Sequence, residues 1–244
     1  MRNLFCVALA ALLCGPAIAA DMPLKAQQNI FAGYPATSGF YFGIGTLGGG
    51  GNANVSTNAA VALGLNSASL TTNQISVNGL VGYAWNVPGS LMFAAAEAWF
   101  GYNNFNGAVP GISFTGPATF TQRFMFGAPL QTIASVFPNF GWTIPPFPPL
   151  PNGQAVTNVK PYLFGSVSED DVSLNFGQAS NKDWRIAPGF GIGALGQLTA
   201  STAIDVFAMM KFPQKGITVG MPVIGAAATG GIDTQYLAGL ALKW

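Results

Sequence analysis

The sequence predicts an all-β protein: a transmembrane antiparallel up-and-down β-barrel of eight strands, with ten strands as the alternative. Three observations indicate this fold class. Half of the 244 residues are hydrophobic but only 7% are charged, whereas a soluble domain normally has about 25% charged residues. Segments of roughly ten residues alternate between apolar and polar or small side chains, which is the period of a β-strand. No segment after the N-terminus is an unbroken apolar run of the ~20 residues that a transmembrane helix needs.

The charge balance excludes several classes of protein. The chain has 9 Lys and Arg, 8 Asp and Glu, and no His. A nucleic-acid-binding protein needs a basic face to replace counterions, so we expect no nucleic-acid partner. A soluble enzyme is disfavoured because a solvated surface normally carries many charges of both signs. Intrinsic disorder is excluded by the high apolar and aromatic content.

The N-terminus predicts a secretory signal peptide over residues 1–19. Arg2 gives a positive start, Leu4 to Leu13 is a short apolar run, and Ala17-Ile18-Ala19 is a small-residue cleavage site. A buried N-terminal helix is the less favoured alternative.

After cleavage, we expect a periplasmic lead-in over residues 20–38 and an outer-membrane β-barrel over residues 39–244. Export would place the barrel in the cell outer membrane, with both termini on the periplasmic side.

Four alternating segments in the N-terminal half predict strands, because apolar residues at every second position share one face. They are residues 40–45, with Phe40, Phe42 and Ile44 on that face; 75–86, with Ile75, Val77, Val81, Tyr83 and Trp85; 92–102, with Met92, Ala94, Ala96, Ala98, Phe100 and Tyr102; and 118–126, with Phe120, Phe124 and Phe126, where Gln122 breaks the rule.

Four further segments follow the same pattern in the C-terminal half. They are residues 159–168, with Val159, Leu163 and Val167 on the apolar face; 184–198, with Trp184, Ile186, Phe190 and Ile192; 202–212, with Ile204, Val206, Met210 and Phe212; and 233–244, with Tyr236, Leu240, Leu242 and Trp244. The last segment has the clearest alternation.

The connections are expected to be short on one side and long on the other. Residues 86–89 and 198–201 fit periplasmic turns, and residues 48–72, 103–116, 168–183 and 213–232 fit long extracellular loops. Residues 127–158 are too long and Pro-rich for a periplasmic turn. Extra strands at Leu130 to Phe137 and Ile217 to Ala226 would give the ten-stranded alternative.

The charged residues of the predicted strands indicate which face meets lipid. On these registers all of them share the polar face with the small residues: Glu97, Arg123, Lys160, Arg185, Asp205, Lys211, Asp233 and Lys243. A charge facing lipid at mid-bilayer costs about 2–4 kcal/mol, so we place the apolar face outward and the polar face in the lumen. Lipid offers no hydrogen bonds to an open sheet edge, and the sheet must therefore close.

The predicted lumen contains a network of charged residues. Glu97 and Arg123 lie on strands expected to be adjacent, and a buried charge must find a partner or water. We expect these two residues to pair. The network is expected to comprise Glu97, Arg123, Lys160, Arg185, Asp205 and Lys211. It would either stabilise the barrel, which we favour, or gate a narrow ion path.

Several segments resemble a known family. The mature start Ala20-Asp21-Met22-Pro23-Leu24-Lys25-Ala26, the strand Gly39-Phe40-Tyr41-Phe42-Gly43 and the segment Asn78 to Asn86 are similar to small Gram-negative outer-membrane barrels of the opacity-protein and porin-like (OmpA-like barrel) type. The end, with Tyr236, Leu240, Leu242 and Trp244, resembles the C-terminal signal that the barrel-assembly machinery reads. The resemblance implies eight strands, a surface or envelope role, and no shared catalytic residues.

The residues do not support catalysis, a metal or a cofactor. Hydrolase triads and dyads usually need His as a base, and both cysteines, Cys6 and Cys14, lie in the signal peptide. Leu13 argues against lipidation of Cys14. Glu169 to Asp171 could bind Ca²⁺, although a solvated loop is favoured. Pro145 to Pro151 could be a polyproline ligand, although a rigid spacer is favoured.

We therefore expect a non-enzymatic barrel with a structural or surface-interaction role in the cell envelope. The alternative is a narrow porin-like channel or a route for small or apolar solutes. The expected partners are outer-membrane lipid and lipopolysaccharide, the barrel-assembly machinery, periplasmic chaperones and an extracellular ligand bound through the loops.

Overall fold

The computed structural model describes residues 38–57, 67–86, 92–109, 111–128, 157–199, 201–212, 214, 216–221 and 226–244. These form strands only: β1 (Gly39–Thr57), β2 (Ser67–Asn86), β3 (Phe93–Val109), β4 (Ile112–Gly127), β5 (Thr157–Phe176), β6 (Ala179–Gln197), β7 (Ala203–Lys211), β8 (Ile217–Met221) and β9 (Ala226–Lys243). Among the described residues, no helix is long and apolar enough to cross a membrane. The predicted signal peptide and lead-in lie outside the described residues, apart from Ser38.

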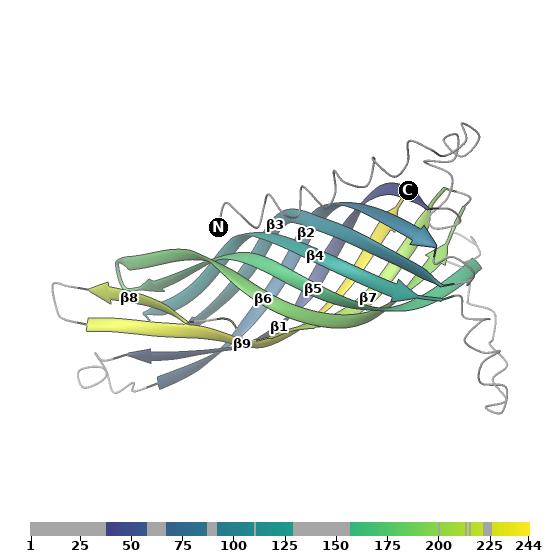
Figure 1. The fold of residues 1–244 in the computed structure, drawn as a ribbon. Coiled ribbons are helices and arrows are strands. Elements are labelled where there is room, and N and C mark those ends of the chain that lie inside the picture. Colours follow the sequence, from purple (N-terminus) through teal and green to yellow (C-terminus); the bar gives the residue numbers. More distant parts are fainter. Residues whose placement is uncertain are drawn as a thin grey trace, which may run out of the picture.

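The strands close into an antiparallel up-and-down barrel (Figure 1). Each strand pairs with its neighbour in the chain from β1 to β7; β7 pairs with β9, and β9 pairs with β1 to complete the ring. The fold class predicted from the sequence is confirmed.

The ring has eight positions, because β7 and β8 share one of them. β8 pairs with Ala226 to Gly230 of β9, and β7 pairs with Gln235 to Lys243 of the same strand. The segment at Ile217 is therefore a strand, as the ten-stranded alternative supposed, but it adds no position. The other extra strand, at Leu130 to Phe137, lies outside the described residues.

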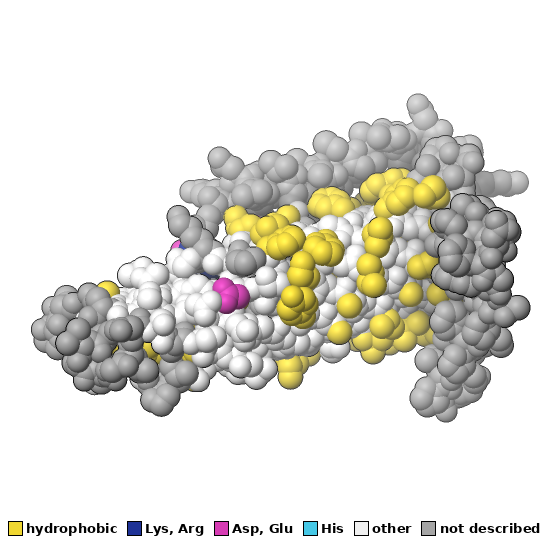
Figure 2. Space-filling view, turned by 90° about the horizontal axis from the view of Figure 1, so that it is seen from below, with side chains coloured by type: hydrophobic (Ala, Val, Ile, Leu, Met, Phe, Trp, Pro, Cys, Tyr) yellow, Lys and Arg dark blue, Asp and Glu magenta, His cyan; other side chains and the backbone are white. Residues whose placement is uncertain are grey.

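The apolar side chains of the predicted strands face outward. Residues such as Ile44, Ile75, Leu163 and Ile192 are 57–65% exposed, and their neighbours in the chain point into the barrel. On the face seen in Figure 2, hydrophobic side chains gather over the half of the barrel toward the chain's C-terminal end (Figure 1), and few are visible on the described part of the far half. We call the hydrophobic side chains of this half the apolar band. The predicted orientation of the strand faces is confirmed for this half.

All of the predicted strands except β7 are longer than predicted, and the prediction of four long loops was largely wrong. Most of residues 48–72, 103–116, 168–183 and 213–232 belong to strands. Tight connections at the far end contain Gly111 (φ 81°) and Gly177 (φ 58°), and this backbone conformation favours glycine.

The error has a physical cause: the pattern inverts beyond the apolar band. At the far end the lumen is apolar, with Val55, Leu70, Phe114 and Leu174 almost completely buried. The outward positions of β1 to β4 there carry mainly Asn, Ser and Thr, so the strands no longer show the outward apolar face that predicted them.

The prediction that Asp233 lies on the lumen-facing side of its strand is also wrong. Gly51 pairs with Gln235 but Ala53 pairs with Ile232, which defines a β-bulge. The bulge breaks the alternation: Ile232 is buried, and the Asp233 carboxylate accepts a hydrogen bond from the exposed side chain of Asn54.

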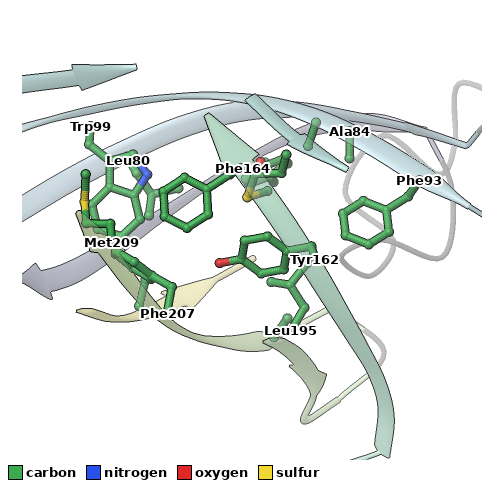
Figure 3. Packing of buried hydrophobic residues seen from close by; sticks show 14 of the residues in the cluster. Leu80, Ala84, Phe93, Trp99, Tyr162, Phe164, Leu195, Phe207 and Met209 are labelled. Atoms are coloured by element: carbon green, nitrogen blue, oxygen red, sulfur yellow. The ribbon is translucent and has the colours of Figure 1, made fainter. Parts of the chain in front are cut away.

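We call the half of the barrel that has the apolar band on its outer wall the apolar-banded half. Its lumen is filled by aromatic side chains (Figure 3). Trp99 and Phe207 meet edge to face with ring centroids 5.3 Å apart, and Phe207 meets Phe164 at 5.8 Å. Some of these rings lie over glycines of neighbouring strands. A Cβ added to Gly239, for example, would come within 2.1 Å of the Phe207 ring. The inward glycines thus make room for the aromatic filling.

The barrel wall has no backbone ladder between β6 and β8 in its far half, among the described residues. Among the described residues, β7 pairs with β6 only from Gly189 to Gln197, and β8 pairs with β9 alone. Between β6 and β8, the side-chain amide of Asn181 donates to the Thr218 carbonyl at 2.6 Å. A side-chain contact therefore spans a seam where other neighbouring strands have a backbone ladder.

Candidate functional site: a buried charge cluster in the lumen

Two carboxylates and two cations meet in the lumen within the apolar-banded half. Glu97 lies on β3, Arg123 on β4, Asp205 on β7 and Lys243 on β9, and each occupies an inward position of its strand. Their side chains are at most 1% exposed. We call these four residues the charge cluster.

Every member of the charge cluster contacts two members of opposite sign. The Arg123 guanidinium lies 3.6 Å from Glu97 Oε2 and 3.5 Å from Asp205 Oδ2. The Lys243 ammonium lies 2.8 Å from Asp205 Oδ2 and also contacts Glu97 Oε1. The formal charges therefore cancel within the cluster, which is the arrangement that makes burial of ions tolerable.

Neighbouring aromatic side chains satisfy further hydrogen bonds of the charge cluster. The Tyr41 hydroxyl and the Trp99 indole N–H each donate to Glu97 at 2.7 Å. Tyr162 accepts a hydrogen bond from Arg123 at 2.6 Å and donates to Asp205. With these three residues the hydrogen-bonded set includes β1, β3, β4, β5, β7 and β9.

Aromatic rings also enclose the guanidinium group. Arg123 Cζ lies 4.0 Å from the Phe207 ring centroid, 4.2 Å from that of Phe164 and 5.1 Å from that of Trp99. Cation–π attraction at such distances is worth about 2 kcal/mol when the cation is desolvated. The planar guanidinium suits this stacking, whereas a lysine ammonium would not fill the space between the rings.

A second cluster lies further along the lumen, around Asp170 of β5. Both of its carboxylate oxygens accept from Lys211 at 3.0 Å. Thr119 donates to the same carboxylate at 2.7 Å and Gln214 at 2.9 Å. These four residues form the second cluster.

The structure brings together some of the residues predicted for the lumen network and separates others. Glu97, Arg123 and Asp205 meet, whereas Lys211 belongs to the second cluster. Arg185 instead pairs with Asp183 at 3.1 Å, and the Lys160 ammonium lies 5.9 Å from the Phe93 ring. The expectation that Arg185 and Lys211 extend the Glu97–Arg123 pair was wrong.

Sequence reasoning missed several members of the two clusters. Lys243 was assigned to the polar face but not to the network. Nothing in the sequence singled out Tyr41 and Trp99 except their place at inward positions of the predicted strands. Asp170 was placed in a loop, although Ser166, Ser168 and Asp170 continue one alternation.

The suggested Ca²⁺ site around Glu169 to Asp171 is not formed by the described residues. Asp170 contacts Lys211, and Asp171 contacts Lys182 at 2.8 Å. The part of the chain that the structure describes contains no group of three His, Cys, Asp or Glu able to hold a metal ion.

The arrangement is suited to blocking the lumen. The ions neutralise one another and are surrounded by aromatic rings. The space beside Arg123, lined by Leu47, Asn78, Trp99 and Phe207, has a volume of about 10 Å³, which is room for about one water molecule.

Comparison with known proteins identifies no family for this chain. No protein-family model matches the sequence, and no curated protein matches it. Among solved structures, the chain is similar to the crystal structure of Neisserial surface protein A, with a TM-score of 0.37 and 17% identity over 84% of this chain and 97% of that chain. The fold described above rests on the strand pairing and not on this likeness.

Proposed function

We propose that the protein is an integral outer-membrane barrel with an occluded lumen, and that its role is structural or one of surface interaction. The observation that carries the proposal is the combination of an apolar outer wall with a lumen filled by the charge cluster and its aromatic rings. A soluble protein would bury this apolar surface, and a diffusion pore would leave the lumen open.

The outer wall supports the membrane location. Monomeric soluble proteins rarely expose large contiguous apolar patches, but here outward Phe, Ile, Leu and Val side chains on all sides of the ring are 37–65% exposed. Outward aromatic residues gather at the end that holds the C-terminus: Phe42 meets Trp244 at 5.3 Å and Phe40 meets Tyr83 at 4.9 Å. Such aromatic girdles are typical of the membrane interfaces of outer-membrane barrels.

The polar outer wall of the far end supports the orientation. An exterior of Asn, Ser and Thr suits water or saccharide and not hydrocarbon, so this end would project from the cell and present its connections to extracellular ligands. The opposite end, with the C-terminus, would face the periplasm. The kinship with opacity-protein and OmpA-like barrels remains part of this proposal.

The expected partners follow from the same arrangement. The outward side chains of Tyr236, Leu240 and Leu242 are 39–65% exposed on β9, so they, together with Trp244, could be read by the barrel-assembly machinery before the strand is inserted. Periplasmic chaperones would protect the apolar outer face until then. Outer-membrane lipid and lipopolysaccharide would cover it afterwards.

A narrow channel is the second candidate function. Buried polar atoms in the lumen lack hydrogen-bond partners within the structure, including Thr72 Oγ1, Gln74 Nε2 and Gln235 Nε2. Such atoms normally bind water, so a file of water could run beside the second cluster. It would have to cross the charge cluster to reach the other end.

Two measurements test the proposal. Closed barrels resist detergent until heated, so the purified protein should change its gel mobility on boiling. In planar bilayers the inserted protein should give no stepwise conductance. Absence of a mobility shift would contradict the barrel in a membrane, and reproducible conductance steps would replace the occluded lumen by the channel.

A further inference from the structure

Part of the far outer wall is polar but uncharged. It consists of outward positions on four adjacent strands, in register with one another. We call these residues the neutral wall: Asn52, Asn54, Ser56, Ser67, Ser69, Thr71, Asn73, Asn104, Asn106, Ser113 and Thr115. All of them are exposed except Ser113, which is half-buried, and none is charged.

The neutral wall favours an uncharged hydrogen-bonding partner. Amide and hydroxyl side chains offer both donors and acceptors, as do the hydroxyl groups of sugars. The Asp233 carboxylate lies against this wall, where it accepts a hydrogen bond from Asn54, and it would repel a phosphate. An anionic headgroup would need Lys or Arg, and the outward positions of the neutral wall supply neither.

An apolar groove begins where the neutral wall ends. Ala208, Ala238 and Gly48 lie side by side across β7, β9 and β1 and form its floor. Larger outward side chains stand beside them: Phe190 and Ile192 are 50% and 59% exposed, and Tyr236 is 65% exposed. This groove encloses about 480 Å³.

The groove continues along the outer wall toward the end that holds the C-terminus. A second hollow of about 850 Å³ shares Ile192, Ala208 and Ala238 with the first, and Leu163 and Val206 line it further on. Along β1, the outward position after Gly48 and Gly50 is Asn52, so the groove and the neutral wall adjoin on one strand. A molecule lying across both would need acyl chains at one end and an uncharged polar group at the other.

We propose that the groove and the neutral wall together bind a glycolipid whose headgroup is an uncharged saccharide. The acyl chains lie in the groove between Phe190, Ile192 and Tyr236, and the sugar hydroxyls meet Asn52, Asn73 and their neighbours. The site rests on the proposed membrane location, since it places the groove among lipid chains. It adds a preference for one class of lipid, which the barrel fold alone does not require.

Native mass spectrometry of the full barrel tests this site. The protein is taken from phosphatidylcholine vesicles that contain digalactosyl diacylglycerol and phosphatidylglycerol in equal amounts, and the retained lipids are identified. We expect digalactosyl diacylglycerol to be retained about tenfold more than phosphatidylglycerol. Equal retention, retention of phosphatidylglycerol alone, or a dimer without bound lipid would overturn the proposal.

Matched variants locate the site. Ala238→Phe fills the groove and should lower the retention of the galactolipid about tenfold, whereas Ala98→Phe, at an outward position of β3, should not change it. Asn73→Lys should shift the preference toward phosphatidylglycerol. Unchanged retention in Ala238→Phe, or an equal loss in Ala98→Phe, would contradict the assigned groove.

The membrane location is checked separately in the same preparations. Flotation with vesicles of phosphatidylcholine alone and the mobility shift on boiling report insertion of the barrel, whatever the headgroup. Flotation with a mobility shift but without lipid preference would refute the glycolipid site and leave the proposed function standing. Failure to float would refute the proposed function itself.

Discussion

Replacing Lys243 by Met should strongly destabilise the barrel. The wild-type charge cluster balances two carboxylates against two cations, and the variant keeps Glu97 and Asp205 with Arg123 as their remaining cation. All these side chains are at most 1% exposed, so water cannot compensate for the lost ammonium group. Removing one partner of a buried ion pair costs about 3–5 kcal/mol, which corresponds to roughly a 10²–10⁴-fold smaller folding equilibrium constant.

Urea unfolding in a detergent or lipid that supports reversible folding measures this change. Trp99 is a suitable fluorescent reporter because its indole N–H donates to Glu97 inside the charge cluster. The free energy is obtained by linear extrapolation to zero denaturant. As a control, Lys182→Met removes an ammonium whose side chain is 58% exposed and whose partner, Asp171, is 4% exposed. We expect a smaller loss of stability than for Lys243→Met, because water already screens the Lys182 ammonium.

A second variant separates charge balance from general disruption of the lumen. Lys243→Met combined with Asp205→Asn leaves one carboxylate, on Glu97, facing Arg123. If the charge argument holds, the double variant is more stable than Lys243→Met alone, with a coupling of about 0.5–3 kcal/mol between contacting residues. The reasoning is refuted if Lys243→Met lowers the free energy of unfolding by less than the Lys182→Met control does. It is also refuted if the effects of Lys243→Met and Asp205→Asn simply add.

Three further predictions use the same unfolding measurement. Arg123→Lys should lower stability by about 2 kcal/mol, because an ammonium loses the stacking on Phe207 that the guanidinium has; equal stability would remove the aromatic enclosure as a cause. Gly239→Ala should destabilise by about 1–3 kcal/mol, because its Cβ meets the Phe207 ring, whereas Gly165→Ala, which has open space around it, should gain about 0.5–1 kcal/mol; the same sign at both positions would contradict this. Lys211→Met should cost about 3–5 kcal/mol and add to the effect of Lys243→Met, and strong coupling would show that the two clusters are one network.

The half of the barrel with the apolar band could be predicted from the sequence because its two faces differ sharply. Outward residues such as Ile44 and Ile75 alternate with small or polar inward ones, and this period is that of a strand whose two sides meet different surroundings. The far half could not be predicted in the same way. There Asn and Ser face outward and residues such as Leu70 and Phe114 face inward, so hydropathy marked where the apolar band ends and not where the strand ends.

The candidate site could be predicted only in part, for reasons of three-dimensional position. Glu97 and Arg123 were linked because their strands were expected to be neighbours, and the register places them opposite each other. Lys243 reaches the same cluster from a strand on another side of the ring, which no spacing in the sequence indicates. Arg185 does lie at an inward position of β6, but further along the strand. The alternation predicts which side of a strand a residue faces, and not how far along the barrel axis it lies.

The seam between β6 and β8 has a consequence for how amide protons exchange with solvent. The strand backbones around Glu97 and Arg123 are held by ladders on both sides, but Ala179 to Ala187 of β6 is laddered on the β5 side alone within the described residues. Local opening needs little free energy where few hydrogen bonds must break. Deuterium uptake should therefore start along this edge, while amides beside Glu97 and Arg123 stay protonated until the whole barrel unfolds.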